Sequence, residues 1–357
     1  MNQEKFIFKN NEGISYTSFW EAPSNIALIK YWGKKGNQIP SNPSISFLLS
    51  ECFTRTKINF SPINSKKEPW FTFKFEGKIR LDFYKKIETF LENILPYVPS
   101  LKMHNLMIDS SNSFPHSSGI ASSASSMAAL ALCITDWERQ INSEMTEETF
   151  KIKASFLARL GSGSASRSIY GPIASWGKTS HLEGSSDRYA IPFKQKIDKI
   201  FDGFCNTIII VDEAKKEISS TEGHRLMNDH PFAKKRFYQA SQNFFEIKKS
   251  LATGDIEKFI QIVESEALTL HALMMTSSPP YKLFKPETIE IIELIKNYRE
   301  NSKTPLCFTL DAGPNIHFLY PKAFRKDVLD FIDDEIIKIF PSIKFIHDQV
   351  GNGPKKI

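Results

Sequence analysis

The segment that most constrains this chain is rich in serine and alanine and occupies residues 112–129, reading NSFPHSSGIASSASSMAA. Gly119 lets the backbone turn where a side chain would clash. The small residues that follow predict a tight loop leading into a buried helix. Ser122 and Ser123 suit the cap or first turn of that helix, where backbone N–H groups have no partner within the helix.

A helix start of this kind can bind phosphate. The unpaired N–H groups and the positive end of the helix dipole both attract an anion. The same residues are also compatible with an ordinary serine-capped core helix. The segment alone therefore leaves both interpretations open.

A second loop of small residues, GSGSASRS, occupies residues 161–168. Its two glycines allow backbone N–H groups to converge, and Arg167 offers a planar fork suited to a carboxylate or a phosphate. A flexible linker is the alternative. The apolar segments on both sides of the loop favour a packed ligand-binding loop instead.

Two charged residues lie in unusual places. Lys30 interrupts the apolar run 26–32, so its ammonium must either reach solvent or meet an anion. Asp311 opens the turn DAGPN after an apolar strand, which suits a side chain that points into a cleft. Taken alone, a basic hairpin edge and an Asx-type turn explain these two positions better.

The hydrophobic pattern predicts a mixed fold of the α/β (α+β) class. A strand or short turn is expected at 26–32, and strands are expected within 52–80, at 107–109, at 206–211 and at 304–310. Helices are expected at 81–95, from 151 to Gly161, and several times between 223 and 300. We place the domain boundary at a turn, which gives domains of residues 1–203 and 204–357.

Composition narrows the class of partner. A chain of 357 residues can form two domains with real cores. The net charge of +6 is a mild excess that suits a small anionic substrate and is too weak to indicate nucleic acid. The four cysteines form no CxxC motif, and no apolar run approaches the length of a membrane span. We therefore expect a cytoplasmic protein with no membrane partner.

Four motifs together resemble the diphosphomevalonate decarboxylase family, a branch of the GHMP kinases. They are NIALIKYWGKK at 25–35, SFPHSSGIASSA at 113–124, GSGSASRS at 161–168 and DAGPN at 311–315. A weaker fifth match spans 215–223. The resemblance implies a two-domain GHMP kinase fold, with a first half like ribosomal S5 domain 2 and an α+β second half. The active site is expected between them.

The resemblance also implies a reaction. ATP, with Mg²⁺, phosphorylates the tertiary 3-hydroxyl of (R)-5-diphosphomevalonate. The 3-phosphate then leaves as CO₂ departs, which yields isopentenyl diphosphate, ADP and phosphate. The family further implies a homodimer. No electron-sink cofactor is required, since the departing carboxylate electrons form the alkene.

Individual roles follow from the same resemblance. Asp311 would orient or deprotonate the 3-hydroxyl, Lys30 would stabilise charge near the transferring phosphoryl group, and Arg167 would hold the substrate carboxylate. Substrate binding is expected at Tyr31, Lys34, Ser162, Gly163, Ser164, Arg167, Ser220 and Thr221. ATP binding is expected at Ser117, Ser118, Gly119, Ala121, Ser122 and Ser123, with Ser122 and Ser123 nearest the Mg²⁺.

Alternative functions share most of these residues. A decarboxylase of 5-phosphomevalonate and a mevalonate 3-kinase are related enzymes, and a silent metabolite-binding protein belongs to another class. Arg167 and Asp311 together favour decarboxylation, because a kinase that stops at phosphorylation has less need of both. The sequence departs from the family pattern at His116, Ser117 and Ser118, which bears on nucleotide contacts.

Overall fold

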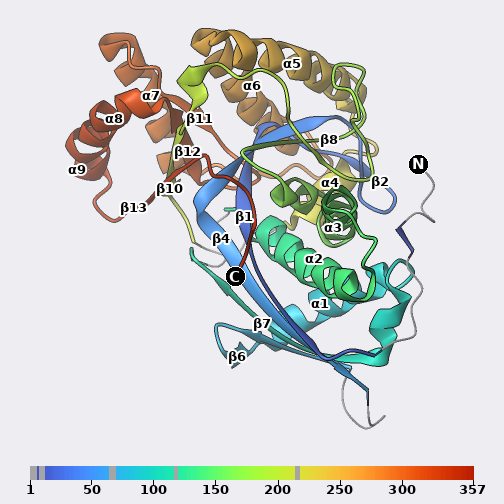
Figure 1. Cartoon of the computed structure of the whole chain (residues 1–357). Coiled ribbons are helices and arrows are strands. Elements are labelled where there is room, and N and C mark those ends of the chain that lie inside the picture. Colours follow the sequence, from blue (N-terminus) through green and yellow to red (C-terminus); the bar gives the residue numbers. More distant parts are fainter. Residues whose placement is uncertain (1–5, 8–12, 64–69, 116–119, 214–217) are drawn as a thin grey trace.

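The chain folds into two halves, each built on a β-sheet covered by helices (Figure 1). The computed structural model describes residues 6–7, 13–63, 70–115, 120–213 and 218–357. Its mixture of helices and sheets confirms the fold class expected from the sequence. Within these described ranges, no helix is both long enough and apolar enough to cross a membrane.

The larger sheet belongs to the first half and has the strand order β14-β1-β4-β7-β5-β6, with β8 paired to β4 and to β9. Its strands are β1 (Tyr16–Ile29), β4 (Ser44–Pro62), β5 (Phe71–Phe75), β6 (Lys78–Ile79), β7 (His104–Asn112), β8 (Ile173–Trp176), β9 (Ile191–Pro192) and β14 (Lys355–Lys356). β1 and β4 pair from Tyr16 to Ile29, so the end of β1 is held firmly just before Lys30. β2 (Lys34–Lys35) and β3 (Ile39–Pro40) form a separate short hairpin.

Strand β5 confirms part of the strand pattern expected within 52–80, and its aromatic residues alternate with polar ones. Phe71, Phe73 and Phe75 are buried, and the residues between them are exposed. Successive side chains of a strand point to opposite faces, so one face of β5 lies on the core. The strand pattern expected within 52–80 is divided between β4 and β5, and residues 64–69 lie outside the described part of the chain.

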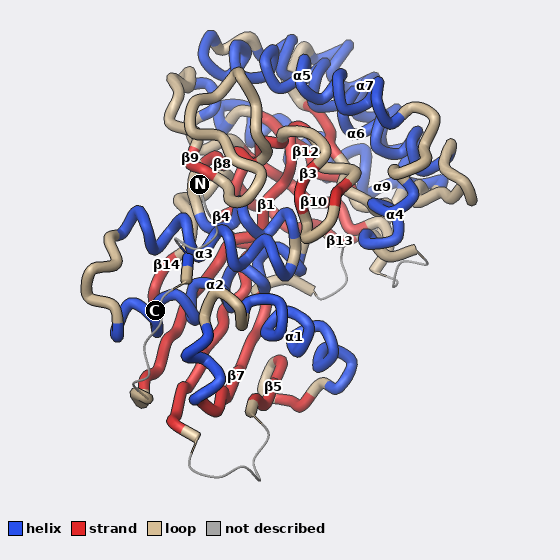
Figure 2. Tube along the Cα trace, turned by 90° about the vertical axis from the view of Figure 1, so that its right-hand side faces the viewer, coloured by secondary structure: helices blue, strands red, loops and turns tan. Residues whose placement is uncertain are grey.

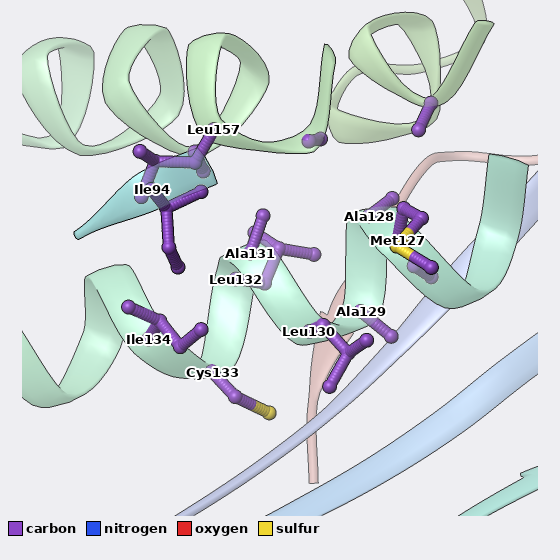
Figure 3. Close-up of a cluster of buried hydrophobic side chains, with 14 of the residues drawn as sticks. Ile94, Met127, Ala128, Ala129, Leu130, Ala131, Leu132, Cys133, Ile134 and Leu157 are labelled. Atoms are coloured by element: carbon purple, nitrogen blue, oxygen red, sulfur yellow. The ribbon is translucent and has the colours of Figure 1, made fainter. Parts of the chain in front are cut away.

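Helices α1 (Leu81–Ile94), α2 (Ser122–Ile141) and α3 (Glu147–Gly161) pack on the larger sheet and on one another (Figure 2). The centre of α2 is completely buried, and its alanines let the helix approach its neighbours closely. Figure 3 shows Ile94 of α1 and Leu157 of α3 around the buried residues of α2. The predicted buried helix after the serine-rich loop is confirmed.

The smaller sheet belongs to the second half and is antiparallel, with the order β11-β12-β10-β13. Its strands are β10 (Cys205–Ile210), β11 (Cys307–Thr309), β12 (Ile316–Tyr320) and β13 (Lys344–Gln349). The helices of this half are α4 (Ser220–Leu226), α5 (Ala233–Thr253), α6 (Ile256–Met275), α7 (Pro286–Ser302), α8 (Arg325–Phe331) and α9 (Ile337–Ile339). α5 and α6 pack side by side, and both also contact β1 of the first half (Figure 1).

A shared core joins the two halves. The ring of Phe47 on β4 lies 5.7 Å from that of Phe204 and 6.1 Å from that of Phe259, measured between centroids. These residues belong to one buried cluster drawn from both halves. The last strand, β14, also returns to pair with β1 of the first half. The end of β1 therefore lies directly against the second half, and this places Lys30 between the two.

Candidate active site

Lys30 follows the last residue of β1 and is buried between the halves. Its Nζ donates to Oδ1 of Asp311 at 2.9 Å. Burial lowers the pKa of Lys30 below its ordinary value, and the attraction of Asp311 opposes that shift. The lysine found in an apolar run thus meets an anion, which was one of the two possibilities open from the sequence.

Asp311 lies in the turn between β11 and β12, as the sequence predicts. Asn315 at the end of that turn accepts from the backbone N–H groups of Val211 and Asp212 and donates to the carbonyl of Asp212. These bonds fix the turn against the end of β10. The Asp311 side chain is 31% exposed while that of Lys30 is 2% exposed, so the carboxylate forms the accessible part of the pair.

Arg167 lies in a short 3-10 helix, Gly163–Ile169, that follows α3. Its Nη1 donates to the hydroxyl of Ser44 at 2.7 Å, and its Nε donates to Oδ1 of Asn25 at 3.3 Å. Burial lowers the pKa of Arg167 to about 10, and the charge of Asp311 opposes the shift. The guanidinium is still charged at neutral pH. A buried, ordered loop replaces the flexible linker that the glycine-rich sequence also allowed.

Serine hydroxyls connect this loop with the start of α2. Ser123 Oγ lies 3.5 Å from Ser162 Oγ, which in turn lies 3.4 Å from Ser164 Oγ. The expected nucleotide and substrate motifs, far apart in sequence, are therefore contiguous in the fold. This adjacency is what a transfer of phosphate between two ligands requires.

The start of α2 has the form expected of an anion site. Ala121 has a left-handed backbone, with φ of 48°, and Ser122 and Ser123 form the first turn. Helix geometry leaves the N–H groups of Ser122 and Ser123 without a partner inside the helix, so they suit a phosphate. Ser117, Ser118 and Gly119, together with His116, lie outside the described residues.

A cavity opens beside the first turn of α2. Aromatic side chains from β5 and α1 make up part of its wall, and serine and asparagine side chains of β7 and α2 add polar groups. The lining includes Phe73, Phe75, Phe83, Ser110, Asn112, Ser122 and Ser123. A pocket that combines ring faces with a few polar groups suits a flat heterocycle.

Tyr31 follows Lys30 and points toward the 3-10 helix. Its ring lies 4.7 Å from that of Trp176 and 4.3 Å from that of His224, measured between centroids. Its buried hydroxyl finds no hydrogen-bond partner among the described residues and lies against Gly163, where an added Cβ would approach it to 2.9 Å. A buried hydroxyl without a partner is costly, which favours a ligand at this position.

Lys34 and α4 lie at the margin of the same region. Lys34 Nζ donates to Gln38 at 3.0 Å, and partial burial lowers the pKa of Lys34. Ser220 and Thr221 are exposed residues in the first turn of α4. Contact between α4 and the site runs through His224, whose Nδ1 accepts from the N–H of Gly33 at 3.0 Å.

Several residues at the site were not found by sequence reasoning. Asn25 and Ser44 hold Arg167, while Glu266 and Arg236 hold the backbone of Lys30. Asn25 lies inside a quoted motif and could have been singled out as a buried polar residue in an apolar strand. Glu266 and Arg236 lie in amphipathic helices, where a charged residue usually indicates a solvated face.

The fold and the site together define a protein of the GHMP kinase class. The N-terminus of α2 suits a phosphate, and the Lys30–Asp311 ion pair lies where the two halves meet. Residues 22–190 match the diphosphomevalonate decarboxylase-like N-terminal domain, and residues 206–356 match the mevalonate 5-diphosphate decarboxylase C-terminal domain. The chain belongs to the diphosphomevalonate decarboxylase family. The resemblance recognised in the sequence is thereby confirmed.

Curated relatives agree with this assignment. The diphosphomevalonate decarboxylase of Candida albicans is 30% identical over 329 residues, covering 89% of this chain and 88% of that protein. The enzyme of the same name from Debaryomyces hansenii is 31% identical over 333 residues, covering 89% of this chain and 82% of that protein.

Solved structures share the fold along nearly the whole chain. Mevalonate diphosphate decarboxylase from Staphylococcus aureus superposes with a TM-score of 0.82 at 29% identity, covering 96% of this chain and 98% of the other. The Enterococcus faecalis enzyme gives 0.81 at 25% identity, covering 96% and 99%. A third structure, described as MDDEF in complex with MVAPP, AMPPCP and magnesium, gives 0.81 at 26% identity, covering 96% and 99%.

Proposed function

We propose that this protein is a diphosphomevalonate decarboxylase, which converts ATP and (R)-5-diphosphomevalonate to isopentenyl diphosphate, ADP, phosphate and CO₂. The observation that carries the proposal is the meeting of Lys30, Asp311 and Arg167 at one place between the halves. Arg167 acts electrostatically on both Lys30 and Asp311, so the three charged groups form one site. Family membership supports the same activity.

The first half of the reaction is phosphoryl transfer to the 3-hydroxyl of the substrate. We assign Asp311 as the carboxylate that orients this hydroxyl and accepts its proton, which is worth about 10²–10⁴-fold in rate. The ammonium of Lys30, 2.9 Å from Asp311, stabilises negative charge on the transferring group. The accessible carboxylate and the buried ammonium suit these separate roles.

The second half of the reaction breaks two bonds at neighbouring carbons. Phosphate leaves C3 with its bonding electrons, and positive character develops at that tertiary carbon. The electrons of the carbon–carboxylate bond then form the alkene, and CO₂ departs. We assign Arg167 to the substrate carboxylate, since its planar fork matches that group and its own position is fixed by Ser44 and Asn25.

The diphosphate end of the substrate requires donors of hydrogen bonds. We assign Tyr31, whose hydroxyl needs a partner, and the cation of Lys34 to this end. Ser162, Gly163 and Ser164 border the same space, and Ser220 and Thr221 are assigned to its outer margin. Glycine at 163 is required because a side chain there would collide with Tyr31.

We assign ATP to the region around the start of α2, with its phosphates at the first turn and its base in the adjacent cavity. Ser122 and Ser123 support this assignment through position, and Ala121 through the backbone turn it provides. Ser117, Ser118 and Gly119 are assigned by motif alone. Bound Mg²⁺ would neutralise charge on the phosphate oxygens. The hydroxyl oxygens of Ser122 and Ser123 are of the hard type that Mg²⁺ accepts.

Two parallel incubations separate this function from its alternatives. The protein is mixed with ATP, Mg²⁺ and either diphosphomevalonate or 5-phosphomevalonate while ADP and CO₂ are measured together. Equal formation of ADP and CO₂ supports the proposal. ADP without CO₂ indicates a 3-kinase, and CO₂ from 5-phosphomevalonate in place of the diphosphate indicates the related decarboxylase. Ligand-induced thermal stabilisation with no turnover indicates a silent metabolite-binding protein.

We also propose that the protein is a cytoplasmic homodimer. All four cysteines are free and buried, which suits a reducing compartment. The family resemblance implies self-association, and exposed apolar side chains on α5 and α6 and just before α5 support it. These are Phe232, Tyr238, Leu268 and Met275. Light scattering coupled to gel filtration tests the dimer, and cell fractionation tests the location.

The division into domains at residues 203 and 204 is likewise a proposal. The two matched domains begin and end on either side of that boundary. The buried cluster shared by the halves and the return of β14 to β1 indicate that the domains stabilise each other. Expression of residues 1–203 alone, followed by chemical unfolding, tests whether the first domain folds independently.

A further inference from the structure

The backbone of Lys30 is held on both sides by charged side chains of the second half. Its N–H donates to Glu266 Oε2 at 2.8 Å, and its carbonyl accepts from Arg236 Nη2 at 3.2 Å. Glu266 lies on α6 and Arg236 on α5. One peptide segment at the end of β1 is therefore gripped by two helices that belong to the other half.

Glu266 and Arg236 also form an ion pair with each other. Arg236 Nη1 donates to Glu266 Oε1 at 2.7 Å, and Nη2 donates to Oε2 at 2.5 Å. Asn243, about two turns of α5 beyond Arg236, is a second donor to Oε1 at 2.7 Å. The side chains are 1% and 0% exposed, so the geometry of the pair is fixed by its surroundings.

Stability alone is a poor explanation for this pair. Burying two charges carries a desolvation cost that their attraction often fails to repay, and apolar side chains of similar size commonly serve as well. Two helices that pack side by side have no need of a charged contact. What apolar side chains cannot provide is a directional acceptor for the N–H of Lys30 and a directional donor for its carbonyl.

We propose that Glu266 and Arg236 are positioning residues, which fix the main chain of Lys30 so that its ammonium meets Asp311 in one geometry. The inference rests on the proposed function, because the proposed function is what assigns Lys30 and Asp311 to phosphoryl transfer. Among the described residues, Lys30 is hydrogen-bonded by Asn42 of the first half and by three side chains of the second half: Glu266, Arg236 and Asp311. The second half therefore supplies both the Asp311 carboxylate and the side chains of Glu266 and Arg236 that align Lys30 with it.

The pair has an electrostatic effect in addition. Lys30 is surrounded by charged groups from four places: Asp311 in the turn after β11, Glu266 on α6, Arg236 on α5 and Arg167 in the 3-10 helix. The neutral imidazole of His317 on β12 is a further titratable neighbour. Burial and Arg167 lower the pKa of Lys30, while Asp311 and Glu266 raise it. Loss of the Glu266 charge would thus weaken the protonation of Lys30.

The test compares two buried ion pairs in the full-length protein. Glu266→Gln and Arg236→Met each remove one member of the positioning pair. Glu138→Gln and Lys153→Met do the same to a pair between α2 and α3. This pair is comparably buried, with 2% and 3% exposure, and no hydrogen bond joins it to Lys30 within the described part of the chain. Each single variant leaves a buried partner uncompensated, so all four should lose stability.

Turnover should separate the two pairs. We expect kcat of Glu266→Gln and Arg236→Met to fall by about 10²-fold, the cost of a small misplacement at a reacting centre, with little change in either KM. The alkaline limb of the kcat profile of Glu266→Gln should also move to lower pH. Glu138→Gln and Lys153→Met should keep the wild-type kcat and the wild-type profile.

A double variant distinguishes positioning from stability if the single variants fold poorly. Glu266→Gln combined with Arg236→Met removes both charges and should recover stability toward wild type. Positioning predicts that kcat stays low in this variant, because the Lys30 carbonyl loses its donor from α5 and keeps the one from Asn42 in the first half. Recovery of kcat together with stability would overturn the proposal.

Crystal structures give a readout that does not depend on turnover. In the double variant, we expect the distance between Lys30 Nζ and Asp311 Oδ1 to exceed hydrogen-bonding range. The distance should stay near 2.9 Å in Glu138→Gln. An unchanged contact in the double variant would overturn the inference whatever the rates are. A wild-type protein without activity would count against the proposed function, and the crystallographic comparison would still decide the positioning role.

Discussion

Lys30 Nζ lies 2.9 Å from Asp311 Oδ1, and this single contact joins residues 281 positions apart from the two halves of the chain. The ammonium is almost completely buried, whereas the carboxylate is partly exposed. A cation in such a place has few alternatives to this anion, because burial disfavours its charge. The pair is therefore coupled to the correct docking of one half on the other.

Replacement of Asp311 by Asn should abolish most turnover. The amide has the shape of the carboxylate but cannot accept the proton of a hydroxyl, so we expect kcat to fall by about 10²–10⁴-fold. Binding of a non-hydrolysable ATP analogue should change little, since the nucleotide is assigned to the start of α2. Steady-state kinetics and calorimetry measure the two quantities.

Asp348→Asn is a suitable control for that variant. Asp348 is buried, and its carboxylate accepts from the backbone N–H groups of residues 50–52. The control should lose stability but keep its kcat. A near-wild-type rate in Asp311→Asn would show that the assignment of Asp311 is wrong.

Replacement of Arg167 by Lys should weaken the use of diphosphomevalonate. Lysine keeps the charge but loses the planar fork, so it cannot bind a carboxylate in two places while contacting Ser44 and Asn25. Loss of one charged hydrogen bond corresponds to about 10–10²-fold in kcat/KM. Kinetics at saturating ATP measure the change, and Arg167→Ala should have a larger effect.

The control for this variant is Arg299→Lys, at an arginine paired with Glu264 away from the serine loops. It should leave kcat/KM near the wild-type value. If Arg167→Lys and Arg299→Lys behaved alike, Arg167 would have no special part in binding the substrate.

The serine hydroxyls at the junction of the two motifs should affect different ligands. Ser123→Ala should raise KM for ATP by about 2–10-fold, the value of one ordinary hydrogen bond, with little change for diphosphomevalonate. Ser162→Ala should show the reverse pattern. The 3.5 Å distance between the two hydroxyls makes each variant the control for the other. If both variants changed the KM of the same substrate, the assignment of Ser123 to ATP and Ser162 to diphosphomevalonate would be wrong.

Thr135→Val provides a further comparison on α2. This hydroxyl bonds to the carbonyl of Ala131 within the helix, far from its first turn, so its removal should alter neither KM. Initial rates over a grid of both substrate concentrations give all of these constants.

Much of the fold could be predicted from the sequence because local patterns reflect burial. The alternating phenylalanines at 71, 73 and 75 correspond to one covered face of β5. The small residues of α2 correspond to a helix packed closely on all sides. Boundaries were less accurate: α3 begins at Glu147, four residues before the predicted start, since Thr146 caps it by accepting from the N–H of Thr149.

The parts of the site that could not be predicted depend on tertiary contact. Arg167 could be predicted because an arginine in a loop of glycine and serine indicates an anion-binding site, even when the residues that contact it are unknown. Glu266 and Arg236 lie 30 residues apart on two helices, and only the packing of those helices brings them to Lys30. The apolar run 26–32 extends beyond the strand, since β1 ends at Ile29. Trp32 is apolar because it packs against α4 and α6 of the second half, and not because it belongs to the sheet.

Two buried histidines should make the protein unstable in acid. Burial lowers the pKa of His224 to about 3 and that of His317 to about 4. In the unfolded chain both titrate near 6.5, so above that pH neither affects the dependence of stability on pH. As pH falls below 6.5, the unfolded state binds protons that the folded state excludes. The free energy of unfolding should therefore decrease, by up to about 1.4 kcal/mol per pH unit for each histidine.

Urea unfolding at pH 7.5, 6.0 and 5.0 measures this decrease. At pH 5.0, each histidine should have removed about 2 kcal/mol relative to pH 7.5. His317→Gln keeps a group able to bond to Asn206, whose Oδ1 lies 3.1 Å from Nδ1 of His317, but cannot titrate. The variant should thus lose less stability between pH 7.5 and 5.0 than the wild type does. An equal loss of stability in His317→Gln and in the wild type over this pH range would contradict the burial argument.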